Sequence, residues 1–304
     1  MERATSNEQL LPTNATMKAK RKKSPGRLRN FILLDTVRFV VLCLGAVSMV
    51  LPLLWMITVA LKSNSEVFTI PPTWIPHQFH WSNFVTGTTQ INFWAVFLNS
   101  VIIAVISTIG QVLSSIAIGY GIARIHFPGR RMWFYLFIGS MMLPSVVGMI
   151  PMFHLYSSLG WYNTWLPLIV PAFFGNPFFV FLARQYFNGI SQSFDEAAKM
   201  DGASHLQVLW HVLMPMSRPI IVTMIIFAFQ GAWNDYQQPL IYLVNPKLWT
   251  LSLAMATYTS QYATSWNLFM AANLIYILPM VILFFVAQKY FMQGLGSLNS
   301  SGLK

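Results

Sequence analysis

Long uncharged stretches, separated by short polar segments, dominate the hydrophobic pattern of this chain. Positions 39–61 form 23 consecutive residues without a charged side chain. A helix that crosses a bilayer needs ~20 residues, so this stretch is long enough to form one. The same reasoning predicts spans at about 39–61, 99–122, 133–154, 165–187, 219–241 and 270–288. The pattern therefore predicts an all-α membrane protein with six transmembrane helices.

The stretch 132–183 contains no Asp, Glu, Lys or Arg and is too long for one span. Gly160 and Asn163 mark a turn near its middle, which separates the third span from the fourth. The fourth span is interrupted by Pro167, Pro171, Gly175 and Pro177. Such breaks are tolerated in lipid only where protein or a water-filled cavity covers the freed backbone groups. We therefore expect the fourth span to face the inside of the assembly.

Composition agrees with this picture and excludes a disulfide framework. Hydrophobic residues make up 55% of the chain and charged residues 9%, against about 25% charged residues in soluble domains. The single cysteine, Cys43, lies in an apolar stretch, and no CxxC metal motif is present. We expect Cys43 to be a small buried side chain.

The net charge is +11, and the distribution of the basic residues along the chain is typical of a membrane protein. Eight Lys and Arg residues lie between Lys18 and Arg38, beside the first span, which favours a topogenic cluster over nucleic-acid binding. If both termini are cytoplasmic, 17 of the 19 Lys and Arg residues lie inside, and only Lys62 and Lys247 lie outside. The positive-inside rule thus predicts cytoplasmic N- and C-termini.

The segment 193–215 is polar and carries three of the eight carboxylates. Ser193 and Glu196 form an S-x-x-E pattern, which predicts a capping box at the start of a short helix. Gly202 is placed to end that helix in the left-handed conformation. A second box, S-x-x-Q, begins at Ser204 and predicts a second short helix that stops at Met-Pro.

The first of these helices has two alternative roles. Ala197 and Ala198 give it a smooth surface that permits close approach, and small side chains lose little entropy on docking. It therefore suits the cleft of another protein. The alternative is an amphipathic helix that lies on the inner leaflet, and the local pattern leaves both open.

The sequence "EAAKMDGASHLQVLWHVLMP" closely resembles the EAA loop of ABC importer permeases. The family pattern is E-A-A, three residues, Gly, nine residues and I-x-L-P, and this chain differs by Val for Ile and Met for Leu. "LNSVIIAV", "MLPSVVGMIPMF", "FAFQGAWNDYQQPLIYL" and "VAQKYFMQGL" resemble segments of the carbohydrate permeases of the maltose type, specifically the six-span partner of the pair. The resemblance covers about 35–304.

This resemblance implies a type I ABC importer transmembrane fold in a bacterial cell membrane, with a cytoplasmic coupling helix. The implied partners are a second permease subunit in a heterodimer, two copies of a cytoplasmic ATP-binding subunit and an extracytoplasmic solute-binding protein. The implied ATPase-coupling residues are Glu196, Ala197, Ala198, Asp201, Gly202 and Pro215. The chain has no G-x-x-x-x-G-K-[ST] phosphate loop. We therefore expect a non-catalytic subunit without a cofactor of its own, whose partner binds ATP and Mg.

The domain organisation expected from these features has four parts. They are a basic cytoplasmic tail (1–30), the first span with its extracytoplasmic loop (31–90), a transmembrane core that includes the EAA loop (91–292) and a cytoplasmic C-terminal tail (293–304).

Five residues are candidates for pore or substrate contacts: Trp233, Asn234, Asp235, Pro144 and Pro151. An ionisable group at membrane depth suggests a function, and an aromatic ring beside amide and carboxylate groups suits a sugar. Asp235 has an alternative role as a cap at the outer end of a span. The sugar site of maltose-type pairs can also lie mostly in the other permease.

The sequence thus predicts the permease subunit of an ATP-driven carbohydrate importer. One alternative is a permease of the same class for a non-sugar solute. A secondary transporter would need inverted repeats and buried coupling carboxylates, and six spans with at most one such carboxylate argue against it. A membrane enzyme lacks support because no Ser/His/Asp, HExxH or paired-carboxylate pattern is present. His154, His205 and His211 have no metal-ligand spacing and are interpreted as structural.

Overall fold

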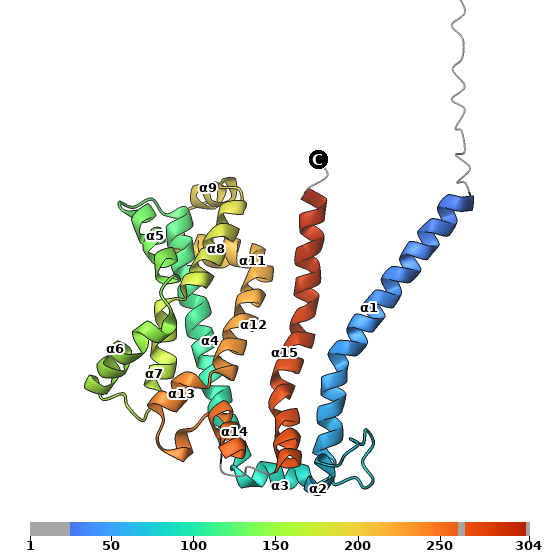
Figure 1. Ribbon diagram of the computed structural model, residues 1–304. Helices are drawn as coiled ribbons and strands as arrows, with labels where there is room; N and C mark the ends of the chain where they lie inside the picture. The colour runs from blue at the N-terminus through green and yellow to red at the C-terminus, as the bar shows by residue number, and fades with distance from the viewer. Residues whose placement is uncertain (1–24, 261–264, 302–304) are drawn as a thin grey trace, which may run out of the picture. The chain divides into compact units, whose positions relative to one another are not determined.

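The computed structural model describes residues 25–260 and 265–301, and all regular secondary structure in this part of the chain is helical (Figure 1). The chain divides into two compact units, Met1–Leu54 and Trp55–Lys304. The helices are α1 (Pro25–Ala60), α2 (Asn64–Val67), α3 (Ser82–Gln90), α4 (Phe93–Arg124), α5 (Arg130–Ser140), α6 (Ser145–Ser158), α7 (Leu166–Ile169), η1 (Val170–Phe174), α8 (Pro177–Gly189), α9 (Ser193–Met200), α10 (His205–Gln207), η2 (Val208–Leu213), α11 (Met214–Met216), α12 (Arg218–Asn234), α13 (Gln237–Tyr242), η3 (Pro246–Leu248), α14 (Leu251–Ser260) and α15 (Trp266–Ser301).

Four of the described helical segments are long and apolar enough to cross a membrane: Asp35–Ala60, Phe93–Arg124, Leu166–Gly189 and Trp266–Gln288. Two further pairs qualify if each bent pair is one span. The helices α5 and α6 meet at 100°, and the segment His205–Met216 meets α12 at 86°.

Two expected spans have different bounds in the structure. The expected span 133–154 is divided between α5 and α6, because the chain leaves the helix before Pro144, which caps α6. The expected span 219–241 ends as a helix at Asn234, and the chain resumes as α13 at Gln237.

The first unit contains most of α1, and its described side chains are exposed throughout. Arg38 forms an ion pair with Asp35 at 3.1 Å on this helix. Cys43 is also exposed, so the prediction that its side chain is buried within this chain is wrong. The apolar stretch that suggested burial is a helix surface suited to lipid rather than to a protein core. The basic cluster predicted before it lies largely in 1–24, outside the described residues.

Helix α4 is the central element of the second unit and packs against α8, α12 and η1. Three serines on α4 hold the broken fourth span. The Ser115 hydroxyl accepts a hydrogen bond from the Asn176 backbone at 2.9 Å. Ser107 donates to the Leu168 carbonyl at 3.1 Å, and Ser114 donates to the Ala172 carbonyl at 3.2 Å. The freed backbone groups are thus covered by protein, as the proline-interrupted sequence predicts.

Helices α4 and α8 approach closely at Gly119, and this contact gives a first prediction. A Cβ added at Gly119 would lie 2.7 Å from the Ala183 Cβ and 3.2 Å from a backbone nitrogen of α8, whereas a Cβ at Gly121 meets nothing within 4 Å. We expect Gly119→Ala to lower stability by about 1–3 kcal/mol through overpacking. Gly121→Ala, on the same helix, is expected to be neutral or stabilising because Ala favours helix. The thermal midpoints of the two purified variants test this; equal midpoints would contradict the close approach.

The loop after α1 is held by buried polar groups. Lys62 is 1% exposed, donates to the Thr73 carbonyl and lies 4.8 Å from the centre of the Trp55 ring. The Asn83 side chain donates to the Ala60 carbonyl at 2.9 Å and to the Lys62 carbonyl at 2.8 Å. The segment 62–90, predicted as a polar loop, is therefore an ordered cap that contains α2 and α3.

Glu66 is the buried carboxylate of this cap. Burial alone would raise the pKa of Glu66, but the His77 backbone donates to its carboxylate at 3.0 Å and the Thr73 hydroxyl donates at 3.1 Å. These bonds, together with the charges of His77 and Lys62, hold the pKa of Glu66 below its ordinary value of 4.5.

A pH dependence follows from this lowered pKa. A carboxylate whose pKa is lower in the folded state stabilises the fold above its unfolded pKa, and the contribution is lost as pH falls through the folded pKa. We expect wild type to be more stable than Glu66→Gln near pH 7, with the difference shrinking below about pH 4.5. Thermal midpoints measured from pH 7 to pH 3.5 test this, with Glu196→Gln at an exposed carboxylate as the control. A difference that does not change with pH would contradict it.

The C-terminal part of α15 also differs from expectation. The segment 293–304 is expected to be a small tail after the last span, yet the described backbone remains helical as far as Ser301. The last span is thus prolonged by a helical extension.

Candidate functional site

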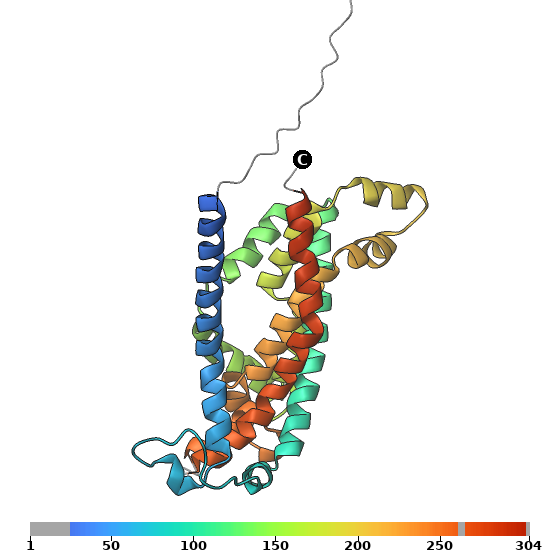
Figure 2. The same ribbon diagram turned by 90° about the vertical axis from the view of Figure 1, so that its right-hand side faces the viewer.

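The polar segment forms a helical hairpin, here called the polar hairpin (residues 193–216), at the end of α4 where α8 also ends. Figure 2 shows it extending sideways from the neighbouring helices. It consists of α9, a turn and the continuous series α10, η2 and α11.

The start of α9 differs from the predicted capping box. Ser193 is already helical, and the preceding residue Gln192 is the N-cap, without a side-chain cap bond. The Glu196 backbone donates to the Gln192 carbonyl at 3.0 Å. The Ser193 hydroxyl instead pairs with that of Ser191 at 2.8 Å. The helix begins one position early, so Ser193 cannot reach the third residue of the helix as a cap.

The end of α9 is the predicted glycine stop. Gly202 has φ of +84°, the left-handed region in which residues with a Cβ are strained. Its N–H donates to the Lys199 carbonyl, and the Ala203 N–H donates to the Ala198 carbonyl, both at 3.0 Å. These two bonds form a Schellman motif. They fix the direction in which the chain leaves the helix.

The second half of the polar hairpin is anchored in the core. Ser204 and Gln207 form the predicted capping box with both reciprocal bonds. The next turns, η2, are a π-helix, a rare form that is frequent at functional sites. Their buried side chains Val208, Leu209 and Leu213 belong to the core formed by α4, α8 and α12.

Pro215 does not end this second helix. It lies in α11, directly after the π-helical turns, and the helix continues to Met216. The chain then bends by 86° at buried Ser217 before α12 begins. The sequence predicts that the helix stops at Met214-Pro215. The helix instead ends one residue later, at Met216, next to the sharp bend.

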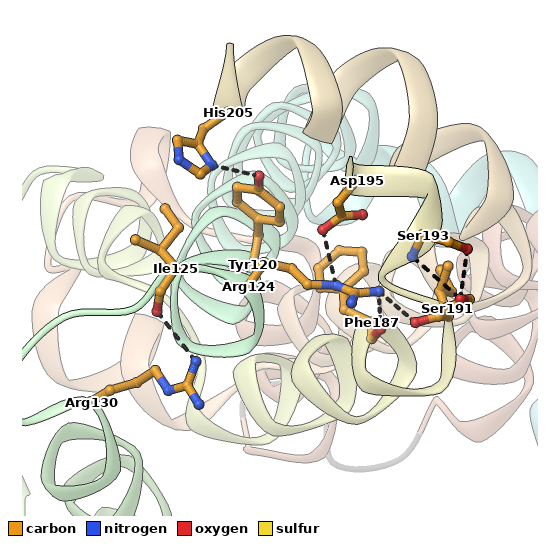
Figure 3. A network of polar contacts seen from close by, with 10 residues as sticks. Tyr120, Arg124, Ile125, Arg130, Phe187, Ser191, Ser193, Asp195 and His205 are labelled. Carbon is orange, nitrogen blue, oxygen red and sulfur yellow. Dashed lines mark hydrogen bonds and ion pairs between the residues drawn. The ribbon is translucent and has the colours of Figure 1, made fainter. Parts of the chain in front are cut away.

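A buried ion pair joins the polar hairpin to α4 (Figure 3). The Asp195 carboxylate lies 3.4 Å from Nε of Arg124, and the two side chains are 8% and 3% exposed. The guanidinium also donates to the Phe187 and Ile190 carbonyls at the end of α8, each at 2.7 Å. Arg124 therefore connects three elements, the ends of α4 and α8 and the start of α9.

Arg124 and Asp195 are functional candidates that sequence reasoning missed. The signals for them were an arginine that closes an uncharged stretch and a carboxylate directly before the E-A-A pattern. Neither signal reveals that the two side chains meet.

A second contact lies beside the ion pair. The Tyr120 hydroxyl on α4 and Nδ1 of His205 on α10 are 3.2 Å apart, and the Tyr120 ring packs edge-on against Phe187. His205, interpreted from the sequence as structural, thus ties the second half of the polar hairpin to α4 (Figure 3).

The opposite surface of the polar hairpin is uncovered. Glu196, Ala197 and Asp201 are exposed, while Ala198 is half-buried against the core. The polar hairpin also exposes five large apolar side chains: Phe194, Met200, Leu206, Trp210 and Met216. Met200 is 88% exposed. Exposed apolar side chains gathered on one short segment are typical of an interaction surface.

Trp233 lies in a packed aromatic cluster rather than on a pore surface. It is 1% exposed, stacks on Phe229 at 5.7 Å and lies 5.5 Å from Phe97. Its indole N–H donates to the Tyr276 carbonyl at 3.3 Å. The expectation that Trp233 offers a ring face to substrate therefore does not fit its position within this chain.

The other pore candidates are on the surface of the chain. Asn234 is exposed and accepts a hydrogen bond from the Tyr276 hydroxyl at 2.8 Å. Asp235 is half-buried and accepts from the Gln238 backbone at 3.1 Å, as a cap at the start of α13. This contact lies in the first turn of α13, whose N-cap is Tyr236, and both roles of Asp235 stay predictions. Pro144 is the N-cap of α6, Pro151 lies inside that helix, and both are exposed.

A cavity between α4 and α12 presents no hydrogen-bonding surface to a sugar. It has a volume of about 410 Å³, and its lining is almost wholly apolar, with no polar surface facing the cavity. Sugar hydroxyls need hydrogen-bond partners, so this cavity is unsuited to them.

Comparisons with known proteins show the family of this chain and agree with its fold. Residues 115–297 match the family model described as binding-protein-dependent transport system inner membrane component. The chain is 33% identical to the probable ABC transporter permease protein YurM of Bacillus subtilis, over 90% of this chain and 91% of that protein. It is 30% identical to the diacetylchitobiose uptake system permease protein NgcG of Streptomyces coelicolor, over 82% and 83%.

A solved structure has the same fold. One chain of a bacterial ABC transporter involved in the import of the acidic polysaccharide alginate superimposes with a TM-score of 0.77. The match is 24% identical and covers 86% of this chain and 98% of that one.

Proposed function

Because this chain belongs to the family of binding-protein-dependent transport system inner membrane components, we propose that it is the membrane-spanning permease subunit of an ATP-driven importer for a carbohydrate. The carbohydrate class rests on relatives such as the diacetylchitobiose permease. The observation that carries the coupling role is the polar hairpin, which is anchored on one side and uncovered on the other.

The topology that we propose has six spans with both termini in the cytoplasm. Each bent helix pair counts as one span, which gives six from the four long helices and two pairs. The distribution of Lys and Arg supports this orientation. The polar hairpin and the ends of α4 and α8 then face the cytoplasm, and the cap formed by 62–90 faces outward.

The polar hairpin would transmit motion from a cytoplasmic ATPase subunit. In this proposal the surface of Glu196 and Ala197, with the exposed apolar side chains around it, docks in a cleft of that subunit. Movement of α9 is passed to α4 and α8 through Arg124 and Asp195, because a buried ion pair resists displacement in a low-dielectric interior. The core anchors of η2 pass the same movement to α12.

The remaining chemistry belongs to the partners in this proposal. ATP and Mg bind to two copies of the ATPase subunit, and this chain contributes no catalytic group. A second permease subunit, in a heterodimer, completes the pore, and an extracytoplasmic binding protein delivers the sugar. Substrate contacts from this chain come from the surface near exposed Asn234, since Trp233 is enclosed by its own chain.

A reconstitution tests this function. The full chain is expressed with its genomic neighbours, purified by a tag on this chain and placed in proteoliposomes. We expect an ATP-binding subunit to co-purify, and ATP hydrolysis to rise when the binding protein and a sugar are added together. Transport by the chain alone, without an ATP-binding subunit, would overturn the proposal in favour of a secondary transporter.

A further inference from the structure

A cavity rich in arginine lies where α4 ends, α5 begins and α8 passes. Its volume is about 310 Å³, and it is lined by Ile122, Arg130, Arg131, Phe134, Tyr135 and Arg184. Three of these six residues carry a permanent positive charge, and none carries a carboxylate. We propose that this cavity binds the phosphate of a membrane phospholipid headgroup.

Arg184 has a donor that needs a partner. Its guanidinium lies 3.8 Å from the centre of the Phe134 ring, in a cation–π contact that holds the group in place. Its Nε is buried and has no hydrogen-bond partner within the described part of the chain. A buried donor without a partner is unfavourable. An anion in the cavity would pair with the guanidinium, which matches the oxygen spacing of phosphate.

Arg130 and Arg131 supply the remaining charge. Arg130 uses one nitrogen in a long bond of 3.4 Å to the Ile125 carbonyl (Figure 3), so most of its donors remain for a ligand. Both residues begin α5, whose N-cap is Gly129, a residue without a side chain to cap the helix. The Arg130 N–H donates to the Phe127 carbonyl at 3.4 Å, and the positive end of the α5 dipole adds to the positive charge at this end of the helix.

The surroundings of the cavity favour a lipid over another source of phosphate. Outward on α5, Met132, Trp133 and Leu136 are all more than half exposed. Apolar and aromatic side chains beside cationic ones are typical of the membrane interface. A basic cavity between helices on the cytoplasmic side is a known form of headgroup site. The lipid tails would then cover this apolar face while the phosphate enters the cavity.

Native mass spectrometry tests the proposal on the full chain purified with its partners. The complex is delipidated and titrated separately with phosphatidylglycerol and with inorganic phosphate. We expect phosphatidylglycerol to bind, and R184Q and R131Q each to weaken that binding about tenfold, the loss of about one charge-assisted bond. R218Q, at an exposed arginine on α12 outside the cavity, makes the same charge change and is expected to have no effect.

The outcomes separate the alternatives. R184Q also removes the contact with Phe134 and could prevent folding. Arg131 is exposed, so R131Q tests the cavity without disturbing a packed side chain. Equal lipid binding by R131Q and wild type would overturn the proposal. Inorganic phosphate that binds as tightly, with the same dependence on the arginines, would overturn the lipid as the ligand. The measurement does not depend on the cargo or on ATP, so it can fail while the transport function holds.

Discussion

Replacing Ala197 with tryptophan is expected to weaken binding of the ATPase subunit and to abolish sugar uptake. Ala197 is an exposed small residue on α9, beside exposed Glu196, at the centre of the surface proposed to enter the ATPase cleft. A large side chain there prevents close approach, and hot-spot contacts are worth at least about 2 kcal/mol. We expect affinity for the ATPase subunit to fall about 30-fold or more, with sugar uptake lost.

The control for this prediction is Ala197→Ser, which keeps the small size. We expect it to retain most of the uptake and most of the co-purified ATPase subunit. Thermal midpoints of both variants should match wild type, since Ala197 makes no contact with the core of this chain. An Ala197→Trp variant that binds the ATPase subunit and transports normally would show that α9 is not the docked surface and would favour the leaflet-bound alternative.

Breaking the ion pair between Arg124 and Asp195 is expected to give the second large effect. Asp195→Asn leaves the Arg124 charge buried without a counter-charge, and removal of one partner of a buried pair costs about 3–5 kcal/mol. We expect a clear fall in the thermal midpoint and the loss of sugar-stimulated ATP hydrolysis. Arg124→Met should be at least as damaging, because the Phe187 and Ile190 carbonyls also lose their donor.

The double variant Arg124→Met/Asp195→Leu is the matched control for this prediction. Apolar replacement of both members of a buried pair is often neutral, so we expect it to be more stable than either single variant. If the pair transmits motion as well as stabilising the fold, stimulated ATP hydrolysis stays low in the double variant. Single-variant losses that simply add in the double variant would contradict a direct interaction between the two residues.

Local signals in the sequence were sufficient for several features of the polar hairpin. The left-handed stop at Gly202 and the box formed by Ser204 and Gln207 depend on residues within one or two turns. Their geometry is therefore set by neighbours in the chain. The sequence also predicted that other groups would cover the broken fourth span, because freed backbone groups must find partners in a membrane. It did not predict that the partners are serines of α4.

Features that depend on distant parts of the chain could not be predicted. Arg124 and Asp195 are far apart in the sequence, and no periodicity indicates that they meet. The exposure of Ala197 and the partial burial of Ala198 follow from how α9 rests on the core. The position of Trp233 inside an aromatic cluster likewise depends on α4 and α15. The division of the predicted span 133–154 at Pro144 depends on the fold as well, because the uncharged stretch alone predicts one continuous helix.

A cysteine cross-link tests the central claim, that the polar hairpin docks on an ATP-binding subunit. The exposed Cys43 is replaced by serine, a single cysteine is placed at the exposed position of Ala197, and the full chain is expressed with its genomic neighbours. We expect a cross-link to the ATP-binding subunit whose yield changes when ATP is added. A cysteine at this position that never links to such a subunit, in a chain that purifies alone and still transports, would contradict it.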